Sequence, residues 1–207
     1  KHHVGESLHP ATIDLLETHL GIKDEIAAQA YAYKFGAVYI WGETREPWRI
    51  LFDERLEVDL PNLTEAELKN ADYEQAWQVH RSSFDRIIYE SAKQQGLETM
   101  DNCEVSAVLF DGHKTAGVQL KSGEIIRASY VLDASGQRCL IGRQKNWIKV
   151  VEDLKSVAMY SYFSGCGGLE APLGRHVQYI VTVPQGWVWF IPVSSEVTSI
   201  GLVTREN

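Results

Sequence analysis

Apolar side chains recur at helical spacing between residues 81 and 95. Four of them share one face of the predicted helix: Phe84, Ile87, Ile88 and Ala92. Gly96 follows directly and is the residue type that commonly ends a helix. A shorter pattern that begins at Pro10 ends at Gly21 in the same way. The chain therefore has predicted helices near residues 10–20 and 81–95.

Elsewhere apolar and polar residues alternate, as they do in half-buried strands. Early strands are predicted at 35–41 and 49–52. Three more, at 104–110, 114–120 and 124–127, are separated by Asp111-Gly112 and Ser122-Gly123, which suit tight hairpin turns. Four further strands are predicted at 157–163, 176–183, 187–193 and 197–204. Helix–strand alternation followed by consecutive strands predicts a mixed fold, of α+β or α/β class, with two sheets.

The composition narrows the range of partners. The chain has 207 residues and a net charge of −8, and charges of both signs are interspersed. Nucleic acid and anionic membranes select clustered Lys and Arg, so we expect neither as a partner. Three cysteines lie far apart without metal-type spacing, which favours a reduced, cytoplasmic protein with no metal site. Because the chain starts at Lys1 and ends just past an alternating run, we expect a central piece of a larger fold.

One candidate binding element is the short apolar run Tyr130-Val131-Leu132, which leads into Asp133-Ala134-Ser135-Gly136. Ligands of open α/β sheets sit at the carboxyl ends of strands, where the backbone must approach them closely. We therefore predict a buried strand whose Asp133 takes a ribose or ribityl hydroxyl, while Gly136 leaves space. An ordinary strand-terminating turn explains the same residues about equally well.

Two further features carry candidate chemistry. Lys34 lies between Tyr33 and Phe35, and a lysine in a dry aromatic setting has a lowered pKa and a nucleophilic amine. A solvated surface charge is the commoner role of a lysine at such a position. Trp187 and Trp189 alternate on one strand and therefore share a face. Two indoles so placed form either an aromatic wall for a substrate or, more commonly, ordinary core.

Five segments, in this order along the chain, resemble segments of the flavin-dependent halogenases, a branch of the para-hydroxybenzoate hydroxylase-like flavoproteins. Gly5-Glu6-Ser7 resembles the G-E-S segment that lies near the flavin, and Tyr33-Lys34-Phe35-Gly36-Ala37 resembles the segment of the essential lysine. Arg81, followed by Phe84-Asp85, resembles the start of a flavin-contacting helix, and Asp133-Ala134-Ser135-Gly136 resembles a D-A-S-G strand end. The most discriminating segment is Trp187-Val188-Trp189-Phe190-Ile191-Pro192, which resembles the W-x-W-x-I-P signature.

The resemblance implies an FAD-dependent monooxygenase (para-hydroxybenzoate hydroxylase-like) fold that is incomplete, with a Rossmann-like flavin part and a second antiparallel substrate sheet. Residues 1–34 and 78–150 are then a partial FAD-binding domain, and residues 35–77 and 151–207 a substrate-side sheet domain. The dinucleotide fingerprint G-x-G-x-x-G is absent from the chain.

The resemblance also implies an activity. FAD, delivered as FADH2 by a separate flavin reductase, would react with O2 to a hydroperoxide that oxidises chloride or bromide. Lys34 would bind or guide the electrophilic halogen toward an electron-rich substrate, either a small molecule or a carrier-bound one. The alternatives are a flavin-dependent monooxygenase or reductase of the same fold, and a non-catalytic fragment that acts as an interaction module.

Particular residues take roles by the same resemblance. Residues that would hold FAD are Gly5, Glu6, Ser7, Arg81, Asp133 and Gly136. We expect Arg81 and Asp133 to lie close together at one edge of the FAD groove. Residues that would screen the flavin from the substrate are Trp187, Trp189, Ile191 and Pro192. Lys34 should then lie in a tunnel with the two tryptophans on its flavin side.

Overall fold

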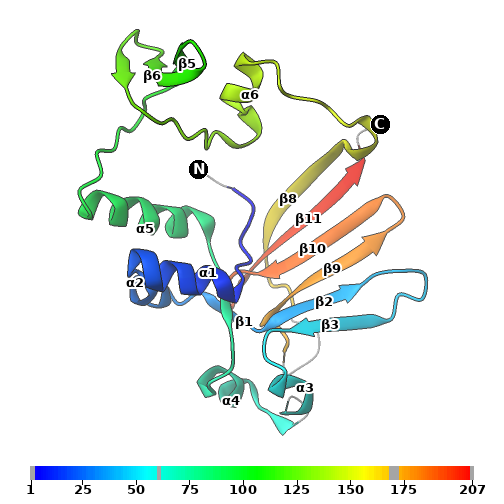
Figure 1. Cartoon of the computed structure of the whole chain (residues 1–207). Coiled ribbons are helices and arrows are strands. Elements are labelled where there is room, and N and C mark those ends of the chain that lie inside the picture. Colours follow the sequence, from blue (N-terminus) through cyan, green and yellow to red (C-terminus); the bar gives the residue numbers. More distant parts are fainter. Residues whose placement is uncertain (1–2, 60–61, 168–172, 206–207) are drawn as a thin grey trace. The chain divides into compact units, whose positions relative to one another are not determined.

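The computed structural model of the chain describes residues 3–59, 62–167 and 173–205 (Figure 1). The chain divides into two compact units. The first unit is Lys1–Leu97 with Ser156–Asn207, and the second unit is Glu98–Lys155. Within the described ranges, no helix has the length and apolar character needed to cross a membrane.

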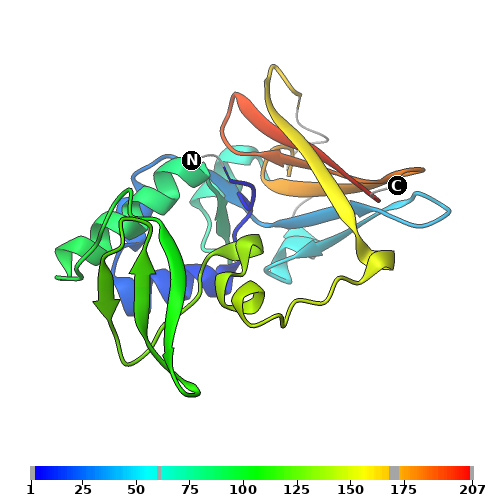
Figure 2. The ribbon, with the colours of Figure 1, turned by 90° about the horizontal axis from the view of Figure 1, so that it is seen from above.

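The first unit contains a six-stranded sheet in the order β3-β2-β9-β10-β11-β8, seen from above in Figure 2. Its strands are β2 (Gly36–Ile40), β3 (Pro47–Leu51), β8 (Ser156–Ser164), β9 (Val177–Val183), β10 (Gly186–Pro192) and β11 (Val197–Arg205). The predicted strands at 157–204 and the early pair are confirmed. β2 runs parallel to β9, whereas the other neighbouring strands are antiparallel. The sheet is therefore mixed. The parallel pair joins the early strand β2 to β9, which comes much later in the sequence.

One face of this sheet packs on two short helices, α3 (Arg55–Asp59) and α4 (Glu65–Asn70). Leu56 and Leu68, one from each helix, are fully buried against Phe35, Val177 and Tyr179. Each of these two acid-rich helices thus places one leucine inward. Both helices are attached to the sheet through a small apolar cluster.

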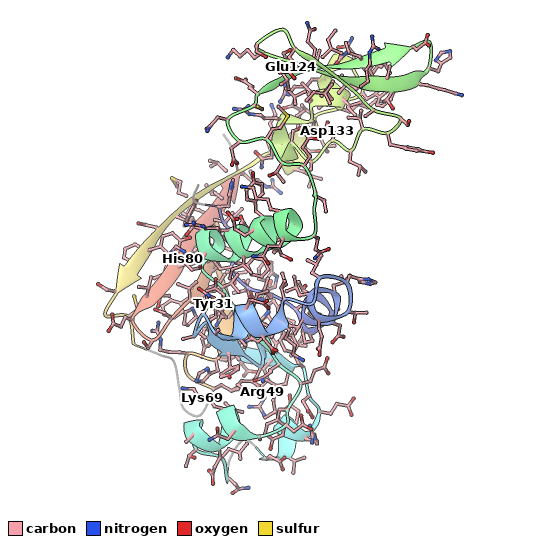
Figure 3. All side chains as sticks on the ribbon, turned by 90° about the vertical axis from the view of Figure 1, so that its left-hand side faces the viewer. Tyr31, Arg49, Lys69, His80, Glu124 and Asp133 are labelled. Carbon is pink, nitrogen blue, oxygen red and sulfur yellow. The ribbon has the colours of Figure 1, made fainter. Side chains whose placement is uncertain are left out.

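A second layer of the first unit is helical. It contains α1 (Pro10–Leu15), a π-helical turn η1 (Leu16–Leu20), α2 (Lys23–Ala27) and α5 (Arg81–Gln94), with the short strand pair β1 (Ala32–Lys34) and β4 (Ala76–Gln78). Gly21 ends the first helical segment in the left-handed conformation, as predicted, with φ 64°. Tyr31, labelled in Figure 3, ties the start of β1 to α5, because its hydroxyl lies 2.5 Å from Ser83 Oγ. Both predicted helices are therefore confirmed.

The second unit is a three-stranded antiparallel meander with short helical turns. Its strands are β5 (Val105–Asp111), β6 (Lys114–Leu120) and β7 (Ile125–Arg127), and its helical turns are η3 (Gly136–Arg138), α6 (Leu140–Gln144) and η4 (Glu152–Leu154). Gly112 and Gly123 take positive φ angles at the two hairpins, as the sequence predicts. The Gln144 amide bonds both backbone groups of Val108 and so holds α6 on β5.

The predicted buried strand at 130–132 is wrong. Residues 129–135 form no strand, and the Tyr130 and Leu132 side chains are 88% and 95% exposed. A buried strand requires neighbours that pair with its backbone and cover its faces. Within the second unit the described strands form the meander alone, and the chain leaves β7 without entering another sheet. The apolar run thus satisfies the sequence pattern of a strand but has no strand partner.

Candidate active site

Lys34 is the last residue of β1, and its backbone pairs with Ala76 of β4. Its side chain is only 4% exposed. The ammonium nitrogen Nζ donates a hydrogen bond of 2.8 Å to the Leu8 carbonyl and lies 4.9 Å from the centre of the Phe52 ring. Burial lowers the pKa of the Lys34 ammonium from 10.5 to about 8, because the charged form loses hydration. Lys34 is therefore not the solvated surface charge that its position alone would favour.

Segment 5–8 runs beside β4 and carries the acceptor for Lys34. Val79 donates its amide to the Glu6 carbonyl at 2.7 Å, and Leu8 donates to the Trp77 carbonyl at 3.0 Å. These two bonds fix the backbone at Glu6 and Leu8 against β4 and its end. The Ser7 hydroxyl is buried and has no hydrogen-bond partner among the described residues.

Glu6, the one carboxylate of this segment, is almost fully buried. Its Oε1 accepts hydrogen bonds from the Tyr162 hydroxyl at 2.8 Å and from Ser199 Oγ at 3.2 Å, and its Oε2 accepts one from the Gly5 amide at 2.9 Å. Burial and the bond to Glu6 raise the pKa of the Tyr162 hydroxyl. These three donors compensate the desolvation of the carboxylate.

Trp187 and Trp189 lie on one face of β10 with ring centres 6.0 Å apart. Trp189 is buried, donates its indole Nε1–H to Ser199 Oγ at 3.1 Å, and covers Gly201 of the neighbouring strand. Trp187 is half-buried and borders a cavity of about 670 Å³ between the β9–β10 turn and the adjacent ends of β8 and β11. The two indoles therefore have different surroundings: Trp187 meets open space and Trp189 is enclosed.

Ile191 and Pro192 complete the W-x-W-x-I-P segment. Both side chains are buried, and Ile191 packs in the same apolar cluster as Trp189. The observed contacts of Ile191 are those of the sheet's own core. A role in screening a flavin stays a prediction for these two residues.

Arg81 opens α5, directly after His80, which is labelled in Figure 3. Its guanidinium donates two bonds to Asp85, at 2.8 and 3.1 Å, and one to the Val4 carbonyl at 2.9 Å. A guanidinium has five N–H donors, so two have no acceptor among the residues that the structure describes. Gly5 has φ 109°, and a Cβ atom there would lie 2.6 Å from Arg81 Nη1. Glycine at position 5 therefore lets the guanidinium pack directly against the backbone.

Asp133 and Gly136 belong to the second unit (Asp133 is labelled in Figure 3). The Asp133 carboxylate accepts bonds from the Ser135 amide, the Ser135 hydroxyl and the Ile141 amide, which lower its pKa. Three of its acceptor positions are thus used within its own turn. Gly136 takes φ 61°, a conformation that suits glycine. The expected proximity of Arg81 and Asp133 stays a prediction, because the two residues belong to different units.

The sequence of the chain is similar to known proteins. Residues 57–207 match the family described as tryptophan halogenase. The chain belongs to this family. The matched part includes Arg81, Trp187 and Trp189, and the stretch 1–56 before it carries Glu6 and Lys34.

Individual halogenases match the whole chain. It is 26% identical over 213 residues to tryptophan 2-halogenase of Chondromyces crocatus and covers 37% of that protein. It is 29% identical over 219 residues to 1H-pyrrole-2-carbonyl-(peptidyl-carrier protein) chlorinase of Pseudomonas fluorescens and covers 48% of it. The solved structure of the myxobacterial chondrochloren halogenase CndH, described as FAD-dependent, superposes with a TM-score of 0.76 at 28% identity over 100% of this chain and 45% of that one. The chain thus spans less than half the length of these relatives, and the mixed α/β halogenase fold is confirmed for it.

Among the residues expected to hold FAD, Arg81 is the one whose side chain could donate charged hydrogen bonds to the anionic part of a flavin dinucleotide. Two of its N–H groups have no acceptor among the described residues, whereas the Asp133 carboxylate already accepts three hydrogen bonds. In the described ranges, no group of three or more His, Cys, Asp or Glu side chains is arranged to hold a metal ion.

Several contact residues of this candidate site are not predicted by the sequence. Phe52, rather than Tyr33 or Phe35, supplies the ring next to the Lys34 ammonium. Ser199 and Tyr162 reach Glu6 from β11 and β8. Gly201 has a signal in the sequence, because an isolated glycine inside a strand often marks the close approach of another group. The other partners have no local signal, since they lie far from Glu6 in the sequence.

Proposed function

We propose that this chain is the lysine-bearing part of an FADH2-dependent halogenase. The observation that carries the proposal is the buried Lys34, whose pKa of about 8 leaves a substantial neutral fraction near neutral pH. A neutral amine has a lone pair that attacks electrophilic halogen, whereas an ammonium has none. Membership of the halogenase family supports the same role.

The cofactor would be held in part by Arg81 and by the backbone around Gly5. Two guanidinium N–H groups without an acceptor among the described residues suit a phosphate or another anionic oxygen, and the missing Cβ of Gly5 lets the guanidinium lie against the backbone there. When bound, reduced FAD together with O2 supplies the two-electron oxidation of chloride or bromide. A separate flavin reductase would provide the reduced cofactor. Glu6 has a structural part here, because its oxygens accept bonds from the protein itself.

Lys34 would act on the hypohalous acid so formed. The amine nitrogen either forms an N–halogen bond, with the oxygen–halogen bond breaking and the amine proton leaving in water, or donates a hydrogen bond that aims the oxidant. The Leu8 carbonyl fixes the direction of Nζ, and the Phe52 ring keeps bulk water away. Both contacts favour one geometry of attack on the substrate.

Trp187 and Trp189 would keep the substrate away from the flavin. Indoles are large and rigid, so they exclude both water and substrate from a reactive site. The cavity beside Trp187 has a volume in the range that small-molecule pockets occupy. By their names, the two relatives halogenate tryptophan and a carrier-bound pyrrole. We therefore propose an electron-rich ring, free or carrier-bound, as the substrate. We propose the cytoplasm as the location, on the cysteine pattern of the sequence.

The test replaces Lys34 in the full-length protein. Lys34→Ala and Lys34→Arg should abolish halogenation while FAD binding and NAD(P)H-driven peroxide formation continue. Lys23→Ala, which removes an exposed lysine paired with Glu17, is the control and should halogenate normally. Near wild-type halogenation by either Lys34 variant would contradict the proposal. A hydroxylated product from the unaltered protein would favour a monooxygenase, and absence of flavin absorption would favour an interaction module.

A further inference from the structure

The Trp189 indole is attached to segment 5–8 through a directed chain of hydrogen bonds. Trp189 Nε1 donates to Ser199 Oγ at 3.1 Å, and Ser199 Oγ donates to Glu6 Oε1 at 3.2 Å. Tyr162 donates to the same Glu6 oxygen at 2.8 Å. Ser199 is fully buried, and Glu6 is almost so. Water therefore has little access to these hydrogen bonds, and each group depends on the protein for its partner.

The chemistry of the groups fixes the direction of every bond. An indole N–H only donates, and an ionised carboxylate only accepts. The Ser199 hydroxyl has a single proton, which goes to Glu6, so its lone pairs are left to receive the indole N–H. An acceptor oxygen at the end of this series of hydrogen bonds strengthens each bond before it. The indole therefore has one favoured orientation about its ring nitrogen.

Gly201 fixes the indole from the other side. It lies opposite Trp189 on β11, and a Cβ atom at this position would come within 2.2 Å of the six-membered ring. The register of β11 with β8 also places Tyr162 beside Ser199 on this face. The six-membered ring therefore contacts a strand that has no side chain at the point of contact. Any larger residue there would displace it.

We propose that Glu6, Ser199 and Gly201 are positioning residues that hold Trp189 in one orientation and so decide how much oxidant reaches Lys34. The functional half of this inference rests on the proposed halogenase activity. Segment 5–8 connects the two positions, because the Leu8 carbonyl that holds Lys34 lies two residues after Glu6. A displaced indole leaves a path by which oxidant is lost as peroxide or transferred as oxygen.

The first test measures the indole directly. In the full-length protein with 15N-labelled tryptophan, the Nε1–H signal of Trp189 is identified by its loss in Trp189→Phe. Ser199→Ala should shift this signal upfield and speed its hydrogen exchange by roughly fivefold or more, the effect of losing one hydrogen bond. Gly201→Ala should move the same signal by displacing the ring. Ser91→Ala, which deletes a buried hydroxyl in α5, is the matched control and should leave the signal unchanged.

The second test measures the products. The ratio of halogenated product to released peroxide should fall by roughly fivefold in Ser199→Ala, in line with the loss of one hydrogen bond, and stay unchanged in Ser91→Ala. An unmoved indole signal in Ser199→Ala overturns the inference, and so does a moved signal with an unchanged ratio.

If the unaltered protein fails to halogenate, the proposed function is wrong, while the indole signal still decides whether these residues position Trp189. Should Ser199→Ala fail to fold, the nearly isosteric Glu6→Gln takes its place, with a smaller shift in the same direction expected and no shift overturning the inference.

Discussion

The protonation of Lys34 gives the sharpest quantitative prediction. Its ammonium has a pKa of about 8, lowered from 10.5 by burial. At pH 7 about a tenth of the molecules then carry a neutral amine, against about 0.03% for an ordinary lysine, a difference of roughly 300-fold. Because only the neutral amine has a free lone pair, halogenation limited by this step should rise about tenfold per pH unit below pH 8 and level off above it.

The pKa is measured by following the 13Cε resonance of Lys34 with pH in a protein that carries labelled lysine. The Lys34→Arg variant lacks this resonance and so assigns it. Phe52→Ala should raise the pKa toward 10.5, because removing the ring over Nζ admits water to the ammonium. A midpoint near 10.5 in the unaltered protein would refute the reasoning from burial.

The same shift makes stability depend on pH in a defined direction. The folded pKa lies below the unfolded one, so between pH 8 and pH 10.5 the unfolded chain binds the Lys34 proton and the folded chain does not. Stability must then increase with pH across this window, by up to about 3 kcal/mol, from 1.36 kcal/mol per pKa unit. Urea unfolding of the unaltered chain and of Lys34→Met isolates this contribution as their difference. A difference that is constant with pH, or that grows toward low pH, would contradict the assignment.

Packing, capping and strand pairing give three further outcomes. Leu56→Ala should lower the free energy of unfolding by about 2–5 kcal/mol, because Leu56 is fully buried. Val58→Ala in the same helix, at a residue that is 75% exposed, should change it by less than about 0.5 kcal/mol. Equal effects of the two substitutions in urea unfolding would argue against the α3 packing. Thr64→Ala removes the capping-box hydroxyl of α4 and should lower the free energy of unfolding by about 1 kcal/mol. No loss in the same assay would show that this cap does not stabilise the fold. Gly36→Ala places a Cβ atom 2.2 Å from the Ile50 carbonyl and should open the β2–β3 pairing, so amide exchange in β3 must accelerate; unchanged exchange would count against that pairing.

Local pattern was sufficient for most of the secondary structure. The helix at Arg81–Gln94 and the strands from Val177 to Arg205 follow from the spacing of apolar residues, because each spacing matches one backbone geometry. Gly112 and Gly123 mark the hairpins of the meander, since tight turns need positive φ angles. The motifs around Lys34 and Trp189 likewise indicated the halogenase family before any contact was known.

Tertiary structure alone decided the contacts that give these residues their properties. Leu8, 26 residues before Lys34, is its acceptor, and Ser199, 193 residues after Glu6, completes the chain to Trp189. The strand expected at 130–132 did not form, although its sequence is as apolar as that of a buried strand. The physical reason is the same in each case. Periodicity reports which side of an element is apolar, whereas burial, pKa and hydrogen-bond partners depend on which distant segments the fold brings alongside.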